Sequence, residues 1–404
     1  MNNFFNNTFR TLKLRNFRLF FMGQSISLIG TWMQSVAMSW LVYRMTGSTL
    51  LLGIVAFCSQ IPTFILSPFA GVFADRYNRH RIVITTQALS MIQAFILAYL
   101  TLTGKIQVWE IIALALFLGC VNAVDIPTRQ SFLIDMVEKK EMLGNAIALN
   151  SAIFNGARLI GPTAAGILVA LAGEGICFLI NGITFLAVIA SLLMMKLTPK
   201  EEKGKEMHVL RELKEGVEYA FGSKSIRMIL FLLSIISMLG MSYVVLMPVF
   251  AADIHHGGSL TLGVLMAAIG VGALIATLYL ASRKTPPTLE RGIPIAAAIF
   301  AAGVILFALS RVLWVSIILL VVTGFGFLAT TASSNTLIQT NVDDDKRGRV
   351  MSFYVMAFMG MAPIGSLLAG ALASKMGAPD ALMLGGALCL FATFVFYRLT
   401  NPHR

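Results

Sequence analysis

A charged turn separates two long apolar runs near the start of the chain and reads Gly71-Val72-Phe73-Ala74-Asp75-Arg76-Tyr77-Asn78-Arg79-His80-Arg81. It gathers three arginines and one aspartate where a helix is expected to end. Cations at the C-terminal end of a helix complement its dipole, and Asp75 can accept hydrogen bonds from free backbone amides or pair with an arginine. Gly71 permits the close approach of a neighbouring helix. A loop that is merely positively charged does not explain this order of residues, so the turn predicts a specific contact.

The apolar runs on both sides of this turn continue through the chain. Apolar residues make up 57% of it and charged residues only 12%, about half the charged fraction of a soluble domain. A helix needs about 20 mostly apolar residues to cross a bilayer. The chain is therefore predicted to be an all-α membrane protein with twelve transmembrane helices. They are placed at 17–43, 50–73, 82–102, 108–135, 146–171, 176–195, 228–250, 260–281, 293–310, 313–337, 350–374 and 379–399.

Positive charge is distributed unevenly between the connections. Of the 31 lysines and arginines, 4 fall in the connections on one side and 2 lie in the interior of spans. The remaining 25 lie on the side that holds both termini, if Arg18 and Arg398 at the ends of the first and last spans are counted there. Loops rich in lysine and arginine stay in the cytoplasm, so both termini are predicted to be cytoplasmic. Because the net charge of +12 sits in these short connections, it argues against a nucleic-acid partner.

One long polar connection divides the spans into two sets of six. The predicted domains are an N-terminal bundle at 1–195, a cytoplasmic linker at 196–227 and a C-terminal bundle at 228–404. Apolar residues at helical spacing within the linker predict an amphipathic helix on the membrane surface. It either joins two halves that move relative to each other or is only a solvated linker. The segments 160–166 and 364–370 match at an offset of 204, which indicates a repeat of the two bundles.

Three charged residues lie well inside predicted spans, away from the span ends: Asp125, Arg129 and Arg158. Charges there are costly unless they are paired or face a wet cavity, so each is a candidate functional residue. Asp125 and Arg129 are four residues apart and share a helix face, and Pro127 between them is expected to bend the helix. A buried carboxylate can exchange protons near neutral pH. Asp125 is therefore the candidate for proton coupling, with Arg129 or Arg158 as its counter-charge; the alternative is a structural salt bridge.

The order of residues in the turn at 71–81 resembles motif A of the major facilitator superfamily, G-x-x-x-D-R-x-x-R-x-R. That family usually has glycine in place of Asn78 and a basic residue in place of His80; asparagine tolerates a left-handed turn nearly as glycine does. The resemblance implies the major facilitator fold, with two six-helix bundles related by a pseudo-two-fold repeat. It also implies a gating contact made by Gly71, Asp75, Arg76, Arg79, Arg81 and, at the end of span four, Asp135.

Further segments resemble the branch that contains the enterobactin exporter and macrolide-efflux transporters, often grouped as the third drug:proton antiporter family. They are Asn16-Phe17-Arg18-Leu19-Phe20, Asp125-Ile126-Pro127-Thr128-Arg129-Gln130 and Arg347-Gly348-Arg349-Val350-Met351-Ser352. Span five partly resembles the antiporter signature, motif C, through Gly156, Gly161, Pro162 and Gly166. Ordinary packing of small residues is the alternative explanation for these four residues.

In the family, spans one, four, seven and ten line the substrate cavity. The resemblance therefore makes five residues cavity candidates: Gln24, Trp32, Gln34, Met241 and Asn335. Such a wall suits a bulky, amphipathic, weakly charged ligand. Helix packing or contact with lipid is the alternative role for most of the methionines and aromatic residues.

The resemblance to this family implies a secondary active transporter. It is expected to export small amphipathic molecules, such as drugs or siderophore-like compounds, in exchange for protons by alternating access. A lipid or lysophospholipid transporter of the same fold is the alternative. The chain shows no nucleophile-base cluster, metal-ligand set or P-loop, so no enzyme activity, metal or cofactor is predicted. The expected setting is a monomer in the bilayer of the bacterial plasma (inner) membrane.

Overall fold

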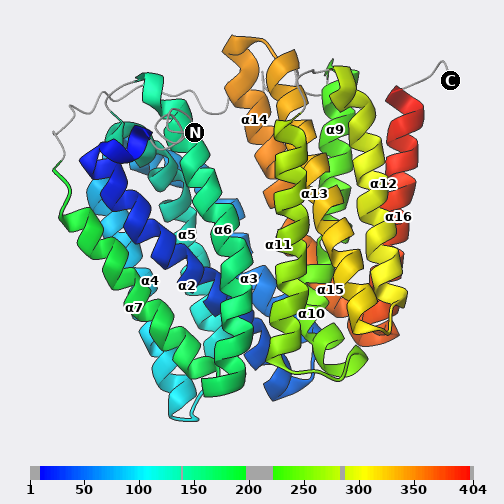
Figure 1. Ribbon diagram of the computed structural model, residues 1–404, viewed down its shortest axis with the longest axis horizontal. Helices are drawn as coiled ribbons and strands as arrows, with labels where there is room; N and C mark the ends of the chain where they lie inside the picture. Colours follow the sequence, from blue (N-terminus) through cyan, green and yellow to red (C-terminus); the bar gives the residue numbers. More distant parts are fainter. Residues whose placement is uncertain (1–9, 138–139, 197–221, 283–286, 401–404) are drawn as a thin grey trace. The chain divides into compact units, whose positions relative to one another are not determined.

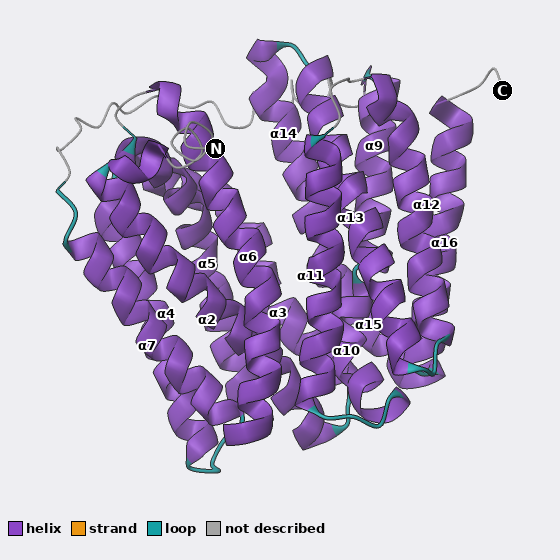
Figure 2. Ribbon diagram, viewed as in Figure 1, coloured by secondary structure: helices purple, strands orange, loops and turns teal. Residues whose placement is uncertain are grey.

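The computed structural model describes residues 10–137, 140–196, 222–282 and 287–400. Within these ranges the regular secondary structure is helical throughout (Figure 2). The first part of the chain forms η1 (Arg10–Lys13), α2 (Arg15–Thr46), α3 (Thr49–Arg76), α4 (Arg79–Leu102), α5 (Val108–Met136), α6 (Lys140–Ala172) and α7 (Glu174–Leu193). Helices α2 to α7 correspond one to one to the first six predicted spans. The predicted amphipathic helix of the linker lies outside the described residues.

The second part of the chain supplies six further spans, two of which are interrupted. It forms α9 (Lys224–Ile235), η2 (Ile236–Gly240), α10 (Ser242–Val249), η3 (Phe250–Ile254), α11 (Ser259–Ala281), α12 (Pro287–Leu309), α13 (Leu313–Asn341), α14 (Asp344–Met359), α15 (Met361–Met376) and α16 (Ala378–Thr400). Elements α9 to η3 together make span seven, and α14 and α15 make span eleven. The short break at 310–312, between spans nine and ten, is where the sequence predicted it.

Eleven helices in the described part of the chain are long and apolar enough to cross a membrane. Helix α2, with 32 residues, is the predicted span that falls outside this group. Two glutamines and several serines along α2 lower its mean hydropathy, although its length is more than sufficient for a span. The prediction of an all-α membrane protein with twelve spans is confirmed.

The contacts between residues divide the chain into two compact units. The first consists of Met1–Val42 and Cys58–Lys205, and the second of Tyr43–Phe57 and Glu206–Arg404. In the first unit α4 packs against α7, and in the second α12 packs against α16 (Figure 1). The predicted domains divided the chain in the linker alone, whereas this grouping also places the end of α2 and the start of α3 in the second unit.

Glycines at an offset of 204 make equivalent contacts in the two units. A Cβ on Gly161 of span five would lie 2.5 Å from Cβ of Trp32 on span one, and a Cβ on Gly365 of span eleven would lie 2.0 Å from the carbonyl oxygen of Met238 on span seven. Gly173 and Gly377, also 204 apart, both have positive φ, 81° and 90°, at the turn into the last span of each half. Only glycine adopts such a backbone readily, so the repeat conserves both close packing and turn geometry.

Candidate functional site

Asp125 lies in the interior of the first unit, where three side chains bind its carboxylate. It is only 4% exposed. Its Oδ1 accepts hydrogen bonds from Thr86 Oγ1 at 2.7 Å and Gln87 Nε2 at 2.9 Å, both on α4. Its Oδ2 lies 3.2 Å from Nε of Arg129, one turn further along α5. Helix α5 continues through Pro127. The buried charge is therefore paired and hydrogen-bonded, as a charge inside a span must be.

Arg129, and not Arg158, is the counter-charge of Asp125 in this structure. The guanidinium carbon of Arg158 lies 5.8 Å from the ring centroid of Trp32, within the usual range of a cation–π contact. Phe154, one turn before Arg158 on α6, meets the same indole edge-on at 5.8 Å between ring centroids. The two intramembrane arginines thus have different neighbours, one a carboxylate and the other an aromatic ring.

The charged turn joins α3 to α4 and contacts the end of α5. Nη1 of Arg79 lies 3.0 Å from Oδ2 of Asp135, and both side chains are partly exposed. The resemblance to motif A placed both residues in one gating contact, and a role of this pair in gating stays a prediction. Arg81 is exposed at the first turn of α4. Gly71, Asp75 and Arg76 were also predicted in this contact, and the contacts of these three residues lie outside the described part of the structure.

The two residues of the turn that depart from motif A have structural roles of their own. Asn78 does not adopt the left-handed backbone that asparagine tolerates, because its φ is −61° and its ψ is 106°. Asn78 is instead the N-cap of α4, and its side chain accepts a hydrogen bond from the backbone N–H of Arg81. Nε2 of His80 lies 2.8 Å from the carbonyl oxygen of Leu192 on α7, and its ring stacks on Phe132.

The residues that partly resemble motif C lie on one continuous helix, α6, which contains Pro162 in its interior. Gly161 allows α2 to approach at Trp32 and Ile29. A Cβ on Gly156 would meet nothing within 4 Å, so that glycine is not required by a neighbour. Gly166 follows on the same helix. The close contact at Gly161 agrees with the packing interpretation of this segment, while a role of the motif in antiport stays a prediction.

A network of three buried amides occupies the middle of the first unit. Gln34 Nε2 donates to Gln93 Oε1 at 2.9 Å, and Asn181 Nδ2 donates to Gln34 Oε1 at 2.8 Å. Gln93 also donates to the carbonyl oxygen of Leu114 at 3.4 Å. Both ends of the Gln34 amide are therefore occupied by protein groups in this structure, although the sequence suggested Gln34 as a cavity residue.

The other cavity candidates differ in their surroundings. Gln24 is 2% exposed, and its Oε1 has no hydrogen-bond partner among the described residues. Trp32 and Met241 are half-buried. Asn335 is also half-buried, and its Oδ1 accepts a hydrogen bond from Gln339 Nε2. Because substrate contact is not described for any of the five, their role in a cavity stays a prediction.

Replacing Gln93 with leucine should destabilise the protein. Gln93 is fully buried, and its loss leaves the amide of Gln34 without an acceptor, which costs about 1–3 kcal/mol. Thermal unfolding of the purified protein in detergent measures the effect. The exposed Gln339 provides a matched control, because its replacement by alanine should change stability by no more than about 0.5 kcal/mol. Equal effects of the two replacements would contradict a structural role for the amide network.

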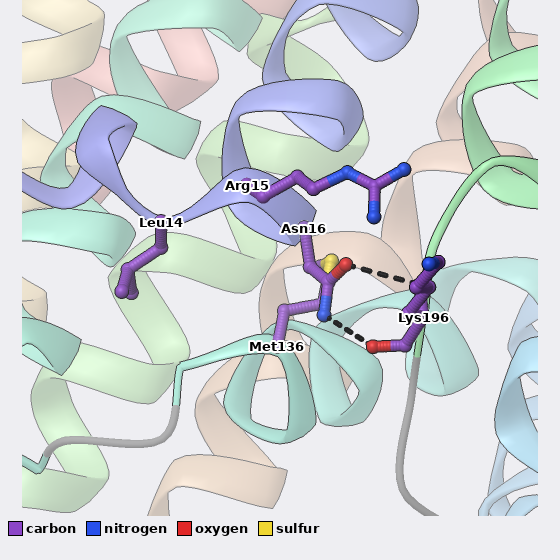
Figure 3. Close-up of a pocket in the computed structure, with 5 residues that line it drawn as sticks. All are labelled: Leu14, Arg15, Asn16, Met136 and Lys196. Carbon is purple, nitrogen blue, oxygen red and sulfur yellow. Dashed lines mark hydrogen bonds between the residues drawn. The ribbon is translucent and has the colours of Figure 1, made fainter.

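A pocket at the start of α2 is lined by Leu14, Arg15, Asn16, Met136 and Lys196 (Figure 3). Asn16 Nδ2 donates to the carbonyl oxygen of Lys196 at 2.8 Å, and the N–H of Lys196 donates to Asn16 Oδ1 at 3.2 Å. The amide of Asn16 thereby ties the chain after α7 to the start of α2. This gives the segment Asn16-Phe17-Arg18-Leu19-Phe20 a structural role, since Phe17 and Phe20 are also buried in the core.

Known proteins with similar sequences support the assignment that the helices and the charged turn suggest. The transmembrane secretion effector family of major facilitator transporters matches residues 6–404. The chain belongs to this family. It is therefore a multi-pass membrane transporter of the major facilitator superfamily and not an enzyme. Small-molecule substrates are implied by its relatives.

Two relatives and one solved structure illustrate the similarity. The staphyloferrin A transporter of Staphylococcus aureus is 29% identical, over 94% of this chain and 95% of that protein. Macrolide efflux protein A of Streptococcus pyogenes is 20% identical, over 95% and 96%. A POT family transporter in complex with a thioalcohol-conjugated peptide superposes with a TM-score of 0.76 at 13% identity, covering 96% of both chains. At that identity the last comparison concerns the fold alone.

Proposed function

We propose that the protein is a secondary active transporter that couples the export of small amphipathic molecules to proton entry. It acts by alternating access as a monomer in the bacterial plasma membrane, with both termini in the cytoplasm. The observation that carries the proposal is the buried, paired carboxylate of Asp125 inside span four. Similarity to the macrolide efflux protein supports the outward direction.

The neighbours of Asp125 can form hydrogen bonds with both its charged and its protonated form. As a carboxylate it pairs with Arg129, and a proton arriving on Oδ2 competes directly with that arginine. Gln87 suits both states: its Nε2 donates to the carboxylate, while its buried Oε1 has no partner among the described residues. After a flip of the amide, this oxygen can accept a hydrogen bond from the protonated acid. Protonation therefore frees Arg129 without leaving Asp125 unsatisfied.

The pair formed by Arg79 and Asp135 supplies the gating part of the proposal. The pair links the start of α4 to the end of α5 at the charged turn. A contact that forms in one conformation and breaks in the other biases the equilibrium between them. Gly71, Asp75 and Arg76 belong to this gate by resemblance. Gln24 and Trp32 in the first unit, and Met241 and Asn335 in the second, are the residues proposed to contact substrate.

Transport in proteoliposomes tests the proposal. With an imposed pH gradient, the amphipathic anionic dye 8-anilinonaphthalene-1-sulfonate should move against the proton flux, and a protonophore should abolish its accumulation. Liposomes without protein, and liposomes with the protein but no gradient, are the controls. Movement of a fluorescent lysophospholipid that is insensitive to the gradient, without dye transport, would instead support the lipid-transporter alternative.

A further inference from the structure

Arg158 is a charged residue in the middle of a span, and no described carboxylate forms an ion pair with it. Helix α6 runs from Lys140 to Ala172, so its midpoint is residue 156, and Arg158 lies within one turn of it. The side chain is half-buried. Its contact is with the ring of Trp32, and no hydrogen bond or ion pair is found for it within the described ranges. Five N–H donors of the guanidinium are therefore available to something other than these protein groups.

The other charges in the middle of the first unit do not balance Arg158. Asp125 is taken up by Arg129, Thr86 and Gln87. That pair is neutral as a whole, so the central part of the described spans keeps one unbalanced positive charge. An arginine at mid-span is costly against lipid, and such residues face the interior of the bundle or a water-filled path. The half-exposed side of Arg158 is thus placed to meet a solute.

The neighbours of Arg158 form a rigid apolar support. Trp32 is held close to α6 because Gly161 has no side chain; a Cβ there would lie 2.5 Å from Cβ of Trp32. Phe154 packs edge-on against the indole and is itself 46% exposed. Trp32 packs against a buried cluster formed by Leu28, Ile153 and Ala157. A flat cation beside two aromatic rings is complementary to an anion attached to an apolar group.

We propose that Arg158, Trp32 and Phe154 bind the carboxylate of an amphipathic organic anion, with Arg158 holding the charge and the rings holding the apolar part. The proposal rests on the proposed transport function and names the substrate class for it. A planar guanidinium binds a planar carboxylate through two parallel hydrogen bonds. One unbalanced cation matches a single negative charge, whereas a phosphate monoester carries nearly two. This changes the sequence-based expectation of a weakly charged ligand.

Binding to the full-length protein in detergent tests this site. The probes are radiolabelled 1-naphthylacetate and 1-naphthylacetamide, which have nearly the same size and differ in charge at pH 7. Equilibrium dialysis should show about tenfold tighter binding of the carboxylate, as expected for a charge-assisted hydrogen bond. Arg158→Gln should remove this preference while leaving the affinity for the amide within about twofold. Arg158→Lys should keep part of the preference for the carboxylate, because the positive charge remains but the bidentate hydrogen-bonding geometry is lost.

Three results would overturn the proposal. The first is that the unaltered protein binds the carboxylate no more tightly than the amide, and the second is that a monodisperse Arg158→Gln protein loses affinity for both probes equally. The third is that lysophosphatidylglycerol displaces the bound carboxylate much more strongly than unlabelled 1-naphthylacetate does. The last would assign the site to a lipid. Transport of 8-anilinonaphthalene-1-sulfonate in the same preparation separates the failure of this site from the failure of the proposed function. If the dye is exported but the protein does not prefer the carboxylate probe, only the proposed Arg158 site is rejected. If the carboxylate binds but export is not driven by protons, only the proposed proton coupling is rejected.

Discussion

Replacing Asp125 with asparagine should abolish proton-driven transport while leaving substrate exchange across the membrane. The substitution keeps the shape of the side chain but removes the group that can bind and release a proton. It also puts an NH₂ group among the donors Thr86, Gln87 and Arg129, which all point at the carboxylate. Proton-driven accumulation of dye in proteoliposomes should fall at least about tenfold, and exchange of internal for external dye should persist, because exchange needs no net proton movement.

The same variant separates coupling from a purely structural salt bridge. Removing one partner of a buried ion pair costs about 3–5 kcal/mol, and the lower end applies because the Arg129 side chain is 23% exposed. If Asp125 only held α4 to α5, exchange and proton-driven transport would fall together with stability. Retained proton-driven transport in a stable Asp125→Asn protein would remove Asp125 from the mechanism.

A double variant provides the matched control for the loss of stability. Adding Arg129→Gln to Asp125→Asn removes the unpaired charge, so thermal stability should recover by more than half. Proton-driven transport should not recover, because the proton-binding group is still missing. Recovery of both properties would contradict a coupling role and support the structural one.

The spans could be predicted from the sequence because length and apolar content alone define them. Helix α5, for example, was placed at 108–135 and runs from Val108 to Met136. The turn at 71–81 identified the superfamily because its charges are close in sequence. The pairing of Asp125 with Arg129 follows from helical spacing for the same reason. Contacts between residues that are at most four positions apart in the sequence can thus be predicted without a structure.

Contacts between distant helices could not be predicted in this way. Thr86 and Gln87 bind Asp125 from α4, about 38 positions earlier, and no local pattern marks them. Trp32 was selected as a cavity residue, but nothing in the sequence pairs it with Arg158. Which residues of two helices meet depends on how each helix is rotated about its axis. The hydrophobic periodicity of the sequence does not determine this rotation when nearly every position in a span is apolar.

The interruptions of span seven were also missed. Elements η2 and η3 are π-helical turns, in which the N–H of Met241 donates to the carbonyl oxygen of Ile236 and that of His255 to Phe250, five residues back. One inserted residue leaves the apolar composition unchanged, so hydropathy cannot detect it. Pro248, which lacks an N–H, is the only local signal near the second turn. Such turns are frequent at functional sites.

Breaking the pair between Arg79 and Asp135 should reduce transport far more than stability. The two side chains are 29% and 22% exposed, and such a partly exposed ion pair contributes no more than about 1 kcal/mol to folding. In a transporter, however, the same small energy changes the ratio of two conformations by about fivefold, and a transport cycle needs both. Asp135→Asn should therefore lower dye efflux several-fold while thermal unfolding in detergent changes little.

Charge reversal distinguishes a specific pair from a general effect of charge at the turn. Arg79→Asp and Asp135→Arg should each reduce transport, and the combined variant should regain a substantial part of it, because the opposite charges face each other again. Arg398→Gln, which removes a cation near Phe394 at the end of α16, is the control and should transport normally. If the combined variant transports no faster than either single variant, the pair is not the gate. A contact that acts through the attraction between two opposite charges should still form when the charges are exchanged.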